Sequence, residues 1–258
     1  FYHVPKCAGT TLGVILSYLF KKQFRALGPL FENNDKGGKT GYVSFLNKLE
    51  DINKGKIDFI YGHIPFEINE FIKSKFLTIT TLRDPIERSI SHYNWMLIRG
   101  FCSEEDDLQE LYNKEKIPRN TIVNQFSGIG IKNKDTDQSL DLSYKNIIDN
   151  IDYVYKSTEI NELFKFLISN YNLPNLFYQS YQVINKKKKI NKKILEIIKK
   201  NNNLDIQLYS KLIEGKIFDN KIEFINDLSE QKFFYSSPVL KINNNNHNTF
   251  NKDRMEEI

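Results

Sequence analysis

Two groups of cationic and hydroxyl side chains mark the places where this chain can bind anions. The first lies near the start and combines Lys6 with Gly9, Thr10 and Thr11. Unpaired backbone N–H groups at a helix start, two hydroxyls and a lysine ammonium can converge on one phosphate-like group. The sequence therefore predicts an anion-binding cradle within residues 3–12.

The second group follows further along the chain. Arg83 and Ser91 can both donate hydrogen bonds to a second anion, Arg83 through its planar fork of N–H groups. Asp84 is suited to cap the helix that follows, and Pro85 suits its first turn, where an N–H would be unpaired anyway. A purely structural role for Arg83, paired with Asp84 or Glu87, stays open at this point.

Both groups lie where an extended segment turns into a helix. Residues 1–4 are apolar and aromatic, which is typical of a buried strand, and the apolar spacing after Thr11 predicts a helix to about Phe24. Residues 76–82 are uncharged and rich in β-branched side chains, which favours a strand covered on both faces. The chain thus repeats one unit, a strand, a polar turn and a helix.

The helix after Asp84 is predicted to be amphipathic. Its expected buried stripe consists of Ile86, Ile90, Tyr93 and Leu97, and its other face carries Arg88, Ser91 and Trp95.

Residues 57–61 form a further predicted strand, which Gly62–Phe66 ends. His63 therefore lies where the carboxyl end of a strand meets a loop, the place where open α/β sheets collect ligands. A loop histidine with only a structural hydrogen bond is the alternative.

Periodicity also predicts a short helix at 43–52, a strand at 152–156, and helices at 160–171, 190–200 and 205–213. Two asparagine tracts, 201–203 and 243–246, are expected to be surface loops.

Length and composition favour one α/β domain over residues 1–258. The chain is 40% hydrophobic and 13% aromatic, which is enough to bury a sizeable core. The net charge of +5 suits anionic ligands. Its lysine-rich stretch at 186–200 has no interleaved aromatic residues, so a solvated helix face is favoured over a nucleic-acid patch.

The sequence leaves the cellular compartment open. No apolar run is long enough to span a bilayer and no signal peptide is visible. The chain starts without Met on a predicted core strand, so we expect that an N-terminal segment has been removed. The cytoplasm is expected for a bacterial or viral-like protein, and the Golgi lumen if that segment was an anchor. Cys7 and Cys102 are too few for a disulfide framework.

Taken together, the two anion-binding groups resemble the motifs of one enzyme family. Pro5–Thr11 (PKCAGTT) is similar to the 5′-phosphosulfate loop of sulfotransferases that use 3′-phosphoadenosine 5′-phosphosulfate (PAPS). Arg83–Tyr93 (RDPIERSISHY) is similar to their 3′-phosphate motif. The form of both motifs most resembles the carbohydrate-type branch, which includes the heparan sulfate 2-O- and 6-O-sulfotransferases and related bacterial proteins. The resemblance is clear over roughly the first hundred residues.

The resemblance implies a role for each matching residue. Lys6, Cys7, Ala8, Gly9, Thr10 and Thr11 would hold the phosphosulfate, and Arg83 and Ser91 the 3′-phosphate. Lys6 would also neutralise charge on the bridging oxygen as the nucleotide leaves. His63 lies in the interval where the 2-O branch carries its basic histidine, which makes it the candidate general base. Glu67 and His92 are the alternative candidates for the general base.

The resemblance also implies the fold and the partners. We expect a P-loop-like three-layer α/β/α fold with a mainly parallel central sheet. The donor is expected to be PAPS, the product adenosine 3′,5′-bisphosphate, and the acceptor a hydroxyl compound, by expectation a carbohydrate. No metal is expected, since the four His and two Cys show no ligand spacing. Nucleic acid and a membrane-spanning segment are not expected.

Some residues depart from the family pattern, and two other functions stay open. Asn124 stands where the family commonly carries Arg, and in the tail Lys241 and Arg254 are weak candidates for nucleotide contacts. A P-loop kinase would share the cradle, but Lys6 precedes Gly-Thr-Thr, whereas a Walker loop has Gly-Lys-Ser/Thr. A non-catalytic module that binds nucleotides or sulfated glycans is the other alternative.

Overall fold

The computed structural model describes residues 1–20, 23–26, 46–63, 66–73, 76–128, 136–171 and 190–218. Lys241 and Arg254, the lysines at 186–189, and the Glu67 side chain lie outside this described part. The elements in chain order are α1 (Gly9–Leu19), β1 (Gln23–Ala26), α3 (Leu49–Asn53), β2 (Phe59–Gly62), the 3₁₀ helix η1 (Phe66–Glu70), β3 (Ile79–Leu82), α4 (Pro85–Ile98), α5 (Leu108–Asn113), α6 (Thr121–Phe126), α7 (Asp137–Asn150), β4 (Tyr153–Lys156), α8 (Ile160–Tyr171), α9 (Lys192–Asn201) and α10 (Asn203–Glu214).

The first residues of the chain join two pairs of parallel strands. β1 pairs with β2 and β3 pairs with β4, both in parallel. Tyr2 makes parallel bridges to Gly62 at the end of β2 and to Thr80 in β3. The Tyr2 N–H donates to the Ile79 carbonyl and the His3 N–H to the Gly62 carbonyl, each at 2.9 Å. The predicted strand at residues 1–4 is therefore the extended segment between β2 and β3.

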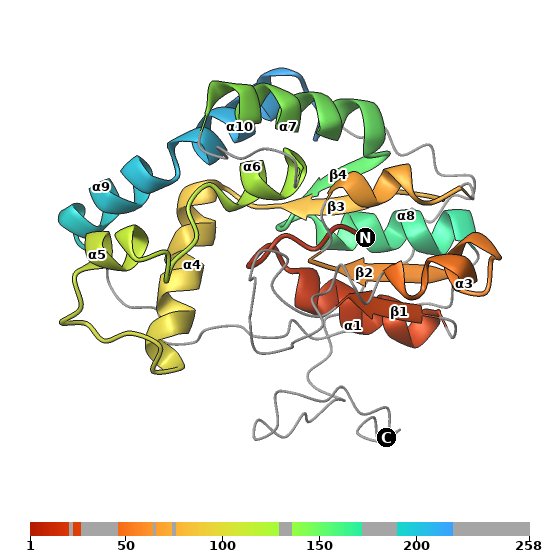
Figure 1. Ribbon diagram of the computed structural model, residues 1–258, viewed down its shortest axis with the longest axis horizontal. Coiled ribbons are helices and arrows are strands. Elements are labelled where there is room, and N and C mark those ends of the chain that lie inside the picture. The colour runs from red at the N-terminus through yellow and green to blue at the C-terminus, as the bar shows by residue number, and fades with distance from the viewer. Residues whose placement is uncertain are drawn as a thin grey trace.

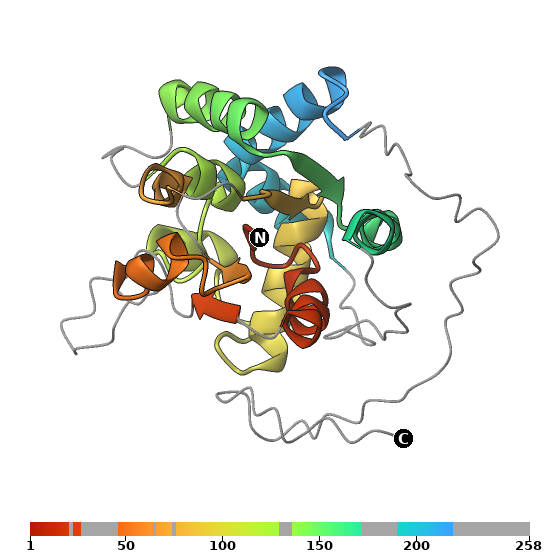
Figure 2. The ribbon, with the colours of Figure 1, turned by 90° about the vertical axis from the view of Figure 1, so that its right-hand side faces the viewer.

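Helices lie on both sides of these strands (Figures 1 and 2). On one side, α1 contacts β2 and α8 contacts β4. Their shared core contains Leu12, Leu16, Phe59, Tyr61, Ile79, Tyr155, Leu163 and Phe164. In Figure 2, α6 lies on the opposite side of the strands from α1 and α8. The core there contains Tyr2, Val4, Leu82, Ile122, Phe126, Ile147, Val154 and Leu208. The protein is a mixed α/β structure with a small parallel sheet.

The other helices form an assembly beside the sheet. α10 packs on α4, α6 and α7, and α9 packs on α4 and α5 (Figure 1). α4 begins as predicted, because the Asp84 carboxylate accepts the N–H groups of Ile86 and Glu87 and Pro85 occupies the first turn. Among the described residues, no helix is long and apolar enough to cross a membrane.

The structure corrects the predicted end of the first helix. α1 ends at Leu19, because Phe20 takes an extended conformation with φ −100° and ψ 109°. Residues 23–26, which fall across the predicted helix end, instead form β1. Pairing with β2 decides this conformation, so a tertiary contact overrides the local helical spacing.

Two further predictions about exposure are wrong. Arg88, expected on a face of α4 other than the buried stripe, is 1% exposed. Residues 201–203, expected to be a surface loop, form the junction of α9 and α10, where Asn201 is 5% and Asn202 0% exposed. The two errors share one cause, since the Arg88 guanidinium donates to the Asn202 carboxamide oxygen at 3.2 Å.

Helices α6 and α10 cap each other. The Asn120 carboxamide oxygen accepts the N–H groups of Leu204 and Asp205 at 3.1 and 3.3 Å. The Asp205 carboxylate in turn accepts the N–H groups of Ile122 and Val123 at 3.1 and 2.8 Å. Asn120 and Asp205 are both buried. Each helix start thus receives its acceptor from the residue at the start of the other helix.

We expect Asp205→Ala to lower the free energy of unfolding by about 3 kcal/mol, because it leaves two buried N–H groups without an acceptor. Asp107→Ala is the matched control. Asp107 is exposed and caps α5 through one N–H, that of Glu110, so its loss should cost about 1 kcal/mol. Urea unfolding followed by circular dichroism measures both. Equal losses in the two variants would contradict the buried reciprocal cap.

Candidate functional site

The turn between residue 4 and α1 has an unusual backbone. Lys6 and Ala8 have φ angles of 69° and 61°, in the left-handed region that side chains disfavour. The Cys7 N–H donates to the Val4 carbonyl at 3.2 Å and the Leu12 N–H to the Ala8 carbonyl at 3.2 Å. Strained backbone of this kind persists only where the surrounding structure holds it, and it is common at binding sites.

The surrounding structure that holds this turn is β3. The Thr81 hydroxyl donates to the Cys7 carbonyl at 2.6 Å, and the Arg83 backbone N–H donates to the Cys7 thiol. Cys7 is completely buried, and burial raises the pKa of its thiol to about 12. The Cys7 side chain is therefore a neutral packing group that ties the first anion-binding turn to the second.

The start of α1 requires glycine for a steric reason. A Cβ atom on Gly9 would lie 1.8 Å from the His3 ring. The His3 ring is in turn stacked on the His63 ring, with 4.5 Å between their centroids. Gly9 therefore lets the first turn of α1 approach the two histidines, and Thr10 and Thr11 follow it in the same turn.

Lys6 lies in a strongly positive environment. The pKa of Lys6 is lowered to about 8, first by burial and then by the positive charges of Arg83 and Arg99. Its Nζ lies 5.6 Å from the centre of the Trp95 ring. The fold thus brings the predicted cation of the first motif near the predicted cation of the second, and an anion between them would relieve their repulsion.

Arg83 keeps part of its hydrogen-bonding capacity. Its Nε donates to the Glu87 carboxylate at 3.1 Å, so the structural pairing considered for this residue is present. The two terminal nitrogens of the guanidinium have no acceptor among the described residues and can still bind an anion. Ser91 is half-buried on α4, two turns from Pro85.

His63 follows β2 and lies beside the extended segment that leads to the turn. Its Nδ1 is 2.8 Å from the His3 carbonyl oxygen. A carbonyl can only accept, so Nδ1 carries the proton in this contact and Nε2 carries the lone pair. This hydrogen bond fixes the tautomer and the orientation of the His63 ring.

The reserve candidate His92 differs from His63 in its environment. Burial, followed by the charges of Arg88 and Lys6, lowers the pKa of His92 to about 3. Its Nδ1 is buried with no hydrogen-bond partner among the described residues. A neutral imidazole with so low a pKa has little affinity for a proton at neutral pH, which favours His63 as the base.

The sequence analysis did not identify three residues near Lys6 as functional. Trp95 contacts Lys6, Arg99 acts on its charge, and Arg88 acts on Cys7 and His92. Arg88 and Trp95 lie on α4, and Arg99 is its C-cap. Trp95 follows Arg88 by seven residues and Arg99 follows Trp95 by four, so with Ser91 they lie on one helix face. That spacing was the signal available in the sequence.

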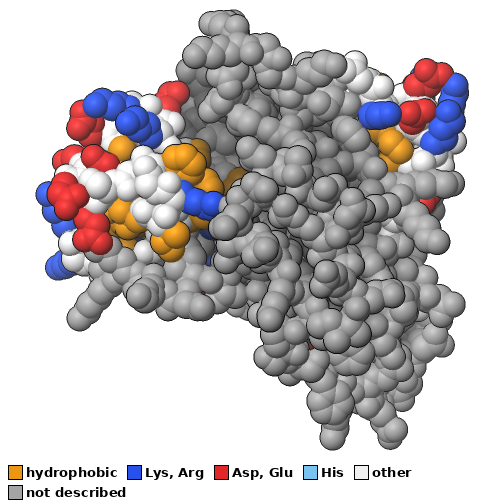
Figure 3. Space-filling model, turned by 90° about the horizontal axis from the view of Figure 1, so that it is seen from below, with side chains coloured by type: hydrophobic (Ala, Val, Ile, Leu, Met, Phe, Trp, Pro, Cys, Tyr) orange, Lys and Arg blue, Asp and Glu red, His pale blue; other side chains and the backbone are white. Residues whose placement is uncertain are grey.

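The same part of α4 leads to an apolar surface. The Trp95 ring packs against Phe101 with 5.3 Å between centroids, and Ile98 and Phe101 are 61% and 60% exposed. In Figure 3, the described part on the left shows hydrophobic side chains among basic and acidic ones. Trp95 therefore connects the Lys6 environment to exposed apolar surface.

Asn124 has a structural role here. Its side-chain amide donates to the Arg119 carbonyl at 2.8 Å, next to the start of α6. Among the described residues, no hydrogen bond joins Asn124 to the turn that holds Lys6. The neighbouring Gln125 makes the link instead, since its Nε2 donates to the His3 carbonyl at 3.4 Å.

We expect Lys6 to titrate near pH 8, well below a free lysine at about 10.4. Arg83→Gln should raise this pKa, because removing a nearby positive charge favours the ammonium form. NMR of ¹³C-labelled lysine side chains measures the titration, with Lys6→Gln to assign the signal and Arg119→Gln as the control. A Lys6 signal that titrates with the other lysines would contradict the described environment.

Comparison with known families gives one match. The model described as "Sulfotransferase family" matches residues 1–211 of the 258. No curated protein matches the chain. Within the part of the chain that the structure describes, no group of three His, Cys, Asp or Glu side chains could hold a metal ion.

Proposed function

Since the chain belongs to the sulfotransferase family, we propose that it transfers the sulfuryl group of PAPS to an acceptor hydroxyl, with a carbohydrate as the acceptor. The reaction resembles phosphoryl transfer, in which positioning and charge stabilisation dominate. We propose in addition that the fold is of the P-loop-like three-layer α/β/α class, for which the parallel strands with helices on both sides are the support.

One observation carries the proposal. The turn that holds Lys6 and the turn that holds Arg83 follow neighbouring parallel segments, and each is bonded to the other through Cys7. The positive charge of Arg83 lowers the pKa of Lys6, after the larger effect of burial. Two cationic groups at the carboxyl ends of adjacent strands suit a donor with two separate anionic groups, as PAPS has.

The residues present fit such a donor. The N–H groups at the start of α1 and the hydroxyls of Thr10 and Thr11 would hold the phosphosulfate. The terminal nitrogens of Arg83 and the Ser91 hydroxyl would hold the 3′-phosphate. Lys6, with its lowered pKa, would place positive charge at the bridging oxygen where negative charge develops during transfer.

His63 is the proposed general base. Its Nδ1 is engaged by the His3 carbonyl, so Nε2 would take the proton of the acceptor hydroxyl. The rings of Trp95 and Phe101 would offer apolar surface to the acceptor beside Lys6. The carbohydrate assignment rests on the motif resemblance to the carbohydrate-type branch.

The two alternatives predict different binding. A P-loop kinase would need a magnesium site and would not distinguish adenosine 3′,5′-bisphosphate from AMP through Arg83. A non-catalytic module would bind the nucleotide without any need for a lysine with a lowered pKa at the turn. Binding and transfer assays therefore separate all three functions.

We expect Arg83→Gln to weaken binding of adenosine 3′,5′-bisphosphate by about ten- to a hundredfold, the loss of a charge-assisted contact to the 3′-phosphate. Binding of AMP, which lacks that phosphate, should change by less than about twofold. Titration calorimetry measures both nucleotides, with Lys56→Gln, an exposed lysine paired with Asp51, as a control outside the site. Equal losses for the two nucleotides would exclude the 3′-phosphate role.

Transfer from ³⁵S-labelled PAPS to a panel of glycans, polyols, phenols and amines tests the activity itself. Lys6→Ala should reduce transfer by about a hundredfold or more while the protein stays folded.

In His63→Asn the ascending limb of the pH–rate profile, which reports deprotonation of the base, should disappear. A profile unchanged in His63→Asn would remove His63 as the base, and full activity of Lys6→Ala would refute the transfer mechanism.

A further inference from the structure

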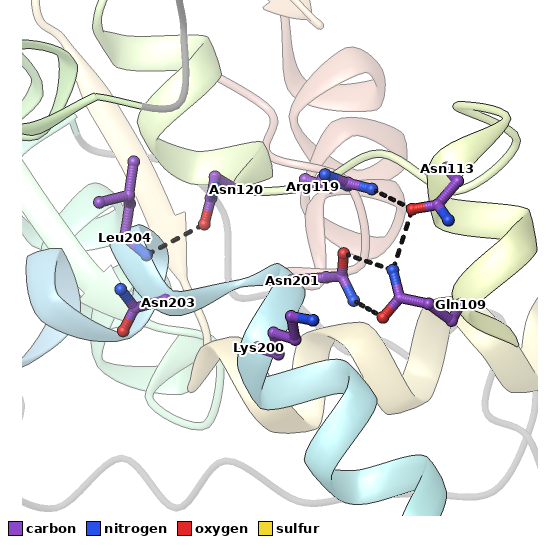
Figure 4. A pocket seen from close by; sticks show the side chains of 8 residues that line it. All are labelled: Gln109, Asn113, Arg119, Asn120, Lys200, Asn201, Asn203 and Leu204. Atoms are coloured by element: carbon purple, nitrogen blue, oxygen red, sulfur yellow. Dashed lines mark hydrogen bonds between the residues drawn. The ribbon is translucent and has the colours of Figure 1, made fainter.

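A second polar site lies where α5, α6 and the junction of α9 with α10 meet. A pocket of about 350 Å³ lies between these elements, and Figure 4 shows the side chains that line it. It contains five carboxamide side chains and two cationic ones, and no acidic side chain lines it. The lining residues are Gln109, Asn113, Arg119, Asn120, Lys200, Asn201, Asn203 and Leu204. None of them belongs to the proposed nucleotide site.

Four of the five carboxamide oxygens around this pocket are already engaged, those of Gln109, Asn113, Asn120 and Asn201. Gln109 and Asn201 form a reciprocal pair, with amide–oxygen distances of 3.0 and 3.4 Å (Figure 4). The Asn113 oxygen accepts from both Gln109 and Arg119, at 3.0 and 2.8 Å. The Asn120 oxygen accepts from the start of α10. Four hydrogen-bond acceptors of the lining are therefore used within the protein.

The lining has hydrogen-bond donors that find no acceptor among the described residues. The Arg119 Nε is buried and has no acceptor among the described residues. The Lys200 ammonium forms no ion pair in the part of the chain that the structure describes, whereas the preceding Lys199 pairs with Glu196. The Asn113 amide nitrogen likewise has no acceptor there. A pocket with unused donors, two positive charges and occupied acceptors is complementary to an oxyanion.

We propose that this pocket binds a small molecule through one oxyanion group, a carboxylate, sulfate or phosphate, held between Arg119 and Lys200. The volume accommodates a single sugar-sized ring. Arg119 supplies one positive charge at the pocket wall, and Lys200 supplies the second. The proposal does not rest on sulfuryl transfer, because it uses other residues and requires no reaction.

Four probes that share a glucose scaffold test the ligand class: glucose 6-phosphate, glucose 6-sulfate, glucuronate and glucose itself. The readout is the NMR signal of the Arg119 Nε–H, assigned by its loss in Arg119→Gln. We expect the charged probes to shift this signal in a saturable way, and glucose to bind at least about tenfold more weakly. The three charged probes rank phosphate, sulfate and carboxylate as the preferred group.

Two lysine variants place the binding in the pocket. Lys200→Gln should weaken the charged probes by about fivefold, as expected for one exposed charge. Lys199→Gln, one residue earlier on α9 and paired outside the lining, should stay within about twofold of the native protein. Both lysines can be changed without touching the buried network.

The outcomes are decisive in either direction. An Arg119 Nε–H signal that no probe moves would overturn the proposal, as would equal losses in Lys199→Gln and Lys200→Gln or a shift by glucose as large as by its charged derivatives. The signal reports this pocket alone, so the result stands whether or not the protein binds adenosine 3′,5′-bisphosphate.

Discussion

The insertion of the first residues between β2 and β3 is the constraint on which the functional site depends. Tyr2 and His3 satisfy their backbone N–H groups on both neighbours, and the chain then has to leave the sheet at Val4. Thr81 and Arg83 of the neighbouring β3 end hold the turn that follows through Cys7. The left-handed conformations of Lys6 and Ala8 are sustained by these contacts rather than by their own preferences.

The arrangement of charge around this turn follows from the same constraint. Because the two turns are joined, Lys6 has positive neighbours, and its pKa is lowered first by burial and then by the charges of Arg83 and Arg99. Arg88 lies buried on α4, where one terminal nitrogen donates to the neutral side chains of Ser89 and Asn202 and the other two nitrogens have no partner among the described residues. Positive charges that lie close together repel one another, and an anion bound between them would relieve that repulsion.

The sequence was sufficient for the parts of the fold that local chemistry determines. The Asp84 cap, Pro85 and the boundaries of α8 follow from short-range patterns, and the family follows from two motifs on strand-to-helix turns. The sequence was not sufficient for features that depend on a partner far along the chain. β1 depends on pairing with β2, and the burial of Arg88 depends on Asn202, which is 114 residues away. Neither contact leaves a local signal.

Site residues divide in the same way. Lys6 and Arg83 stand in motifs, and the fold brings them together. Trp95 and Arg99 were visible only as positions on one face of α4, since nothing in the sequence says which face meets the turn. The asparagine tract at 201–203 departs furthest from the expectation of compositional bias, because Asn201 and Asn202 are buried hydrogen-bonding residues. Low complexity in a sequence does not imply exposure when the amides have partners.

The reciprocal caps of α6 and α10 have a consequence for local motion. Neither helix can fray at its start without removing the acceptor that holds the other, so the two should open as one cooperative unit with similar amide hydrogen-exchange protection. α6 also carries Gln125, which donates to the His3 carbonyl beside His63. The late helix α10, far from the anion-binding turns in sequence, thereby helps to keep the proposed base in place.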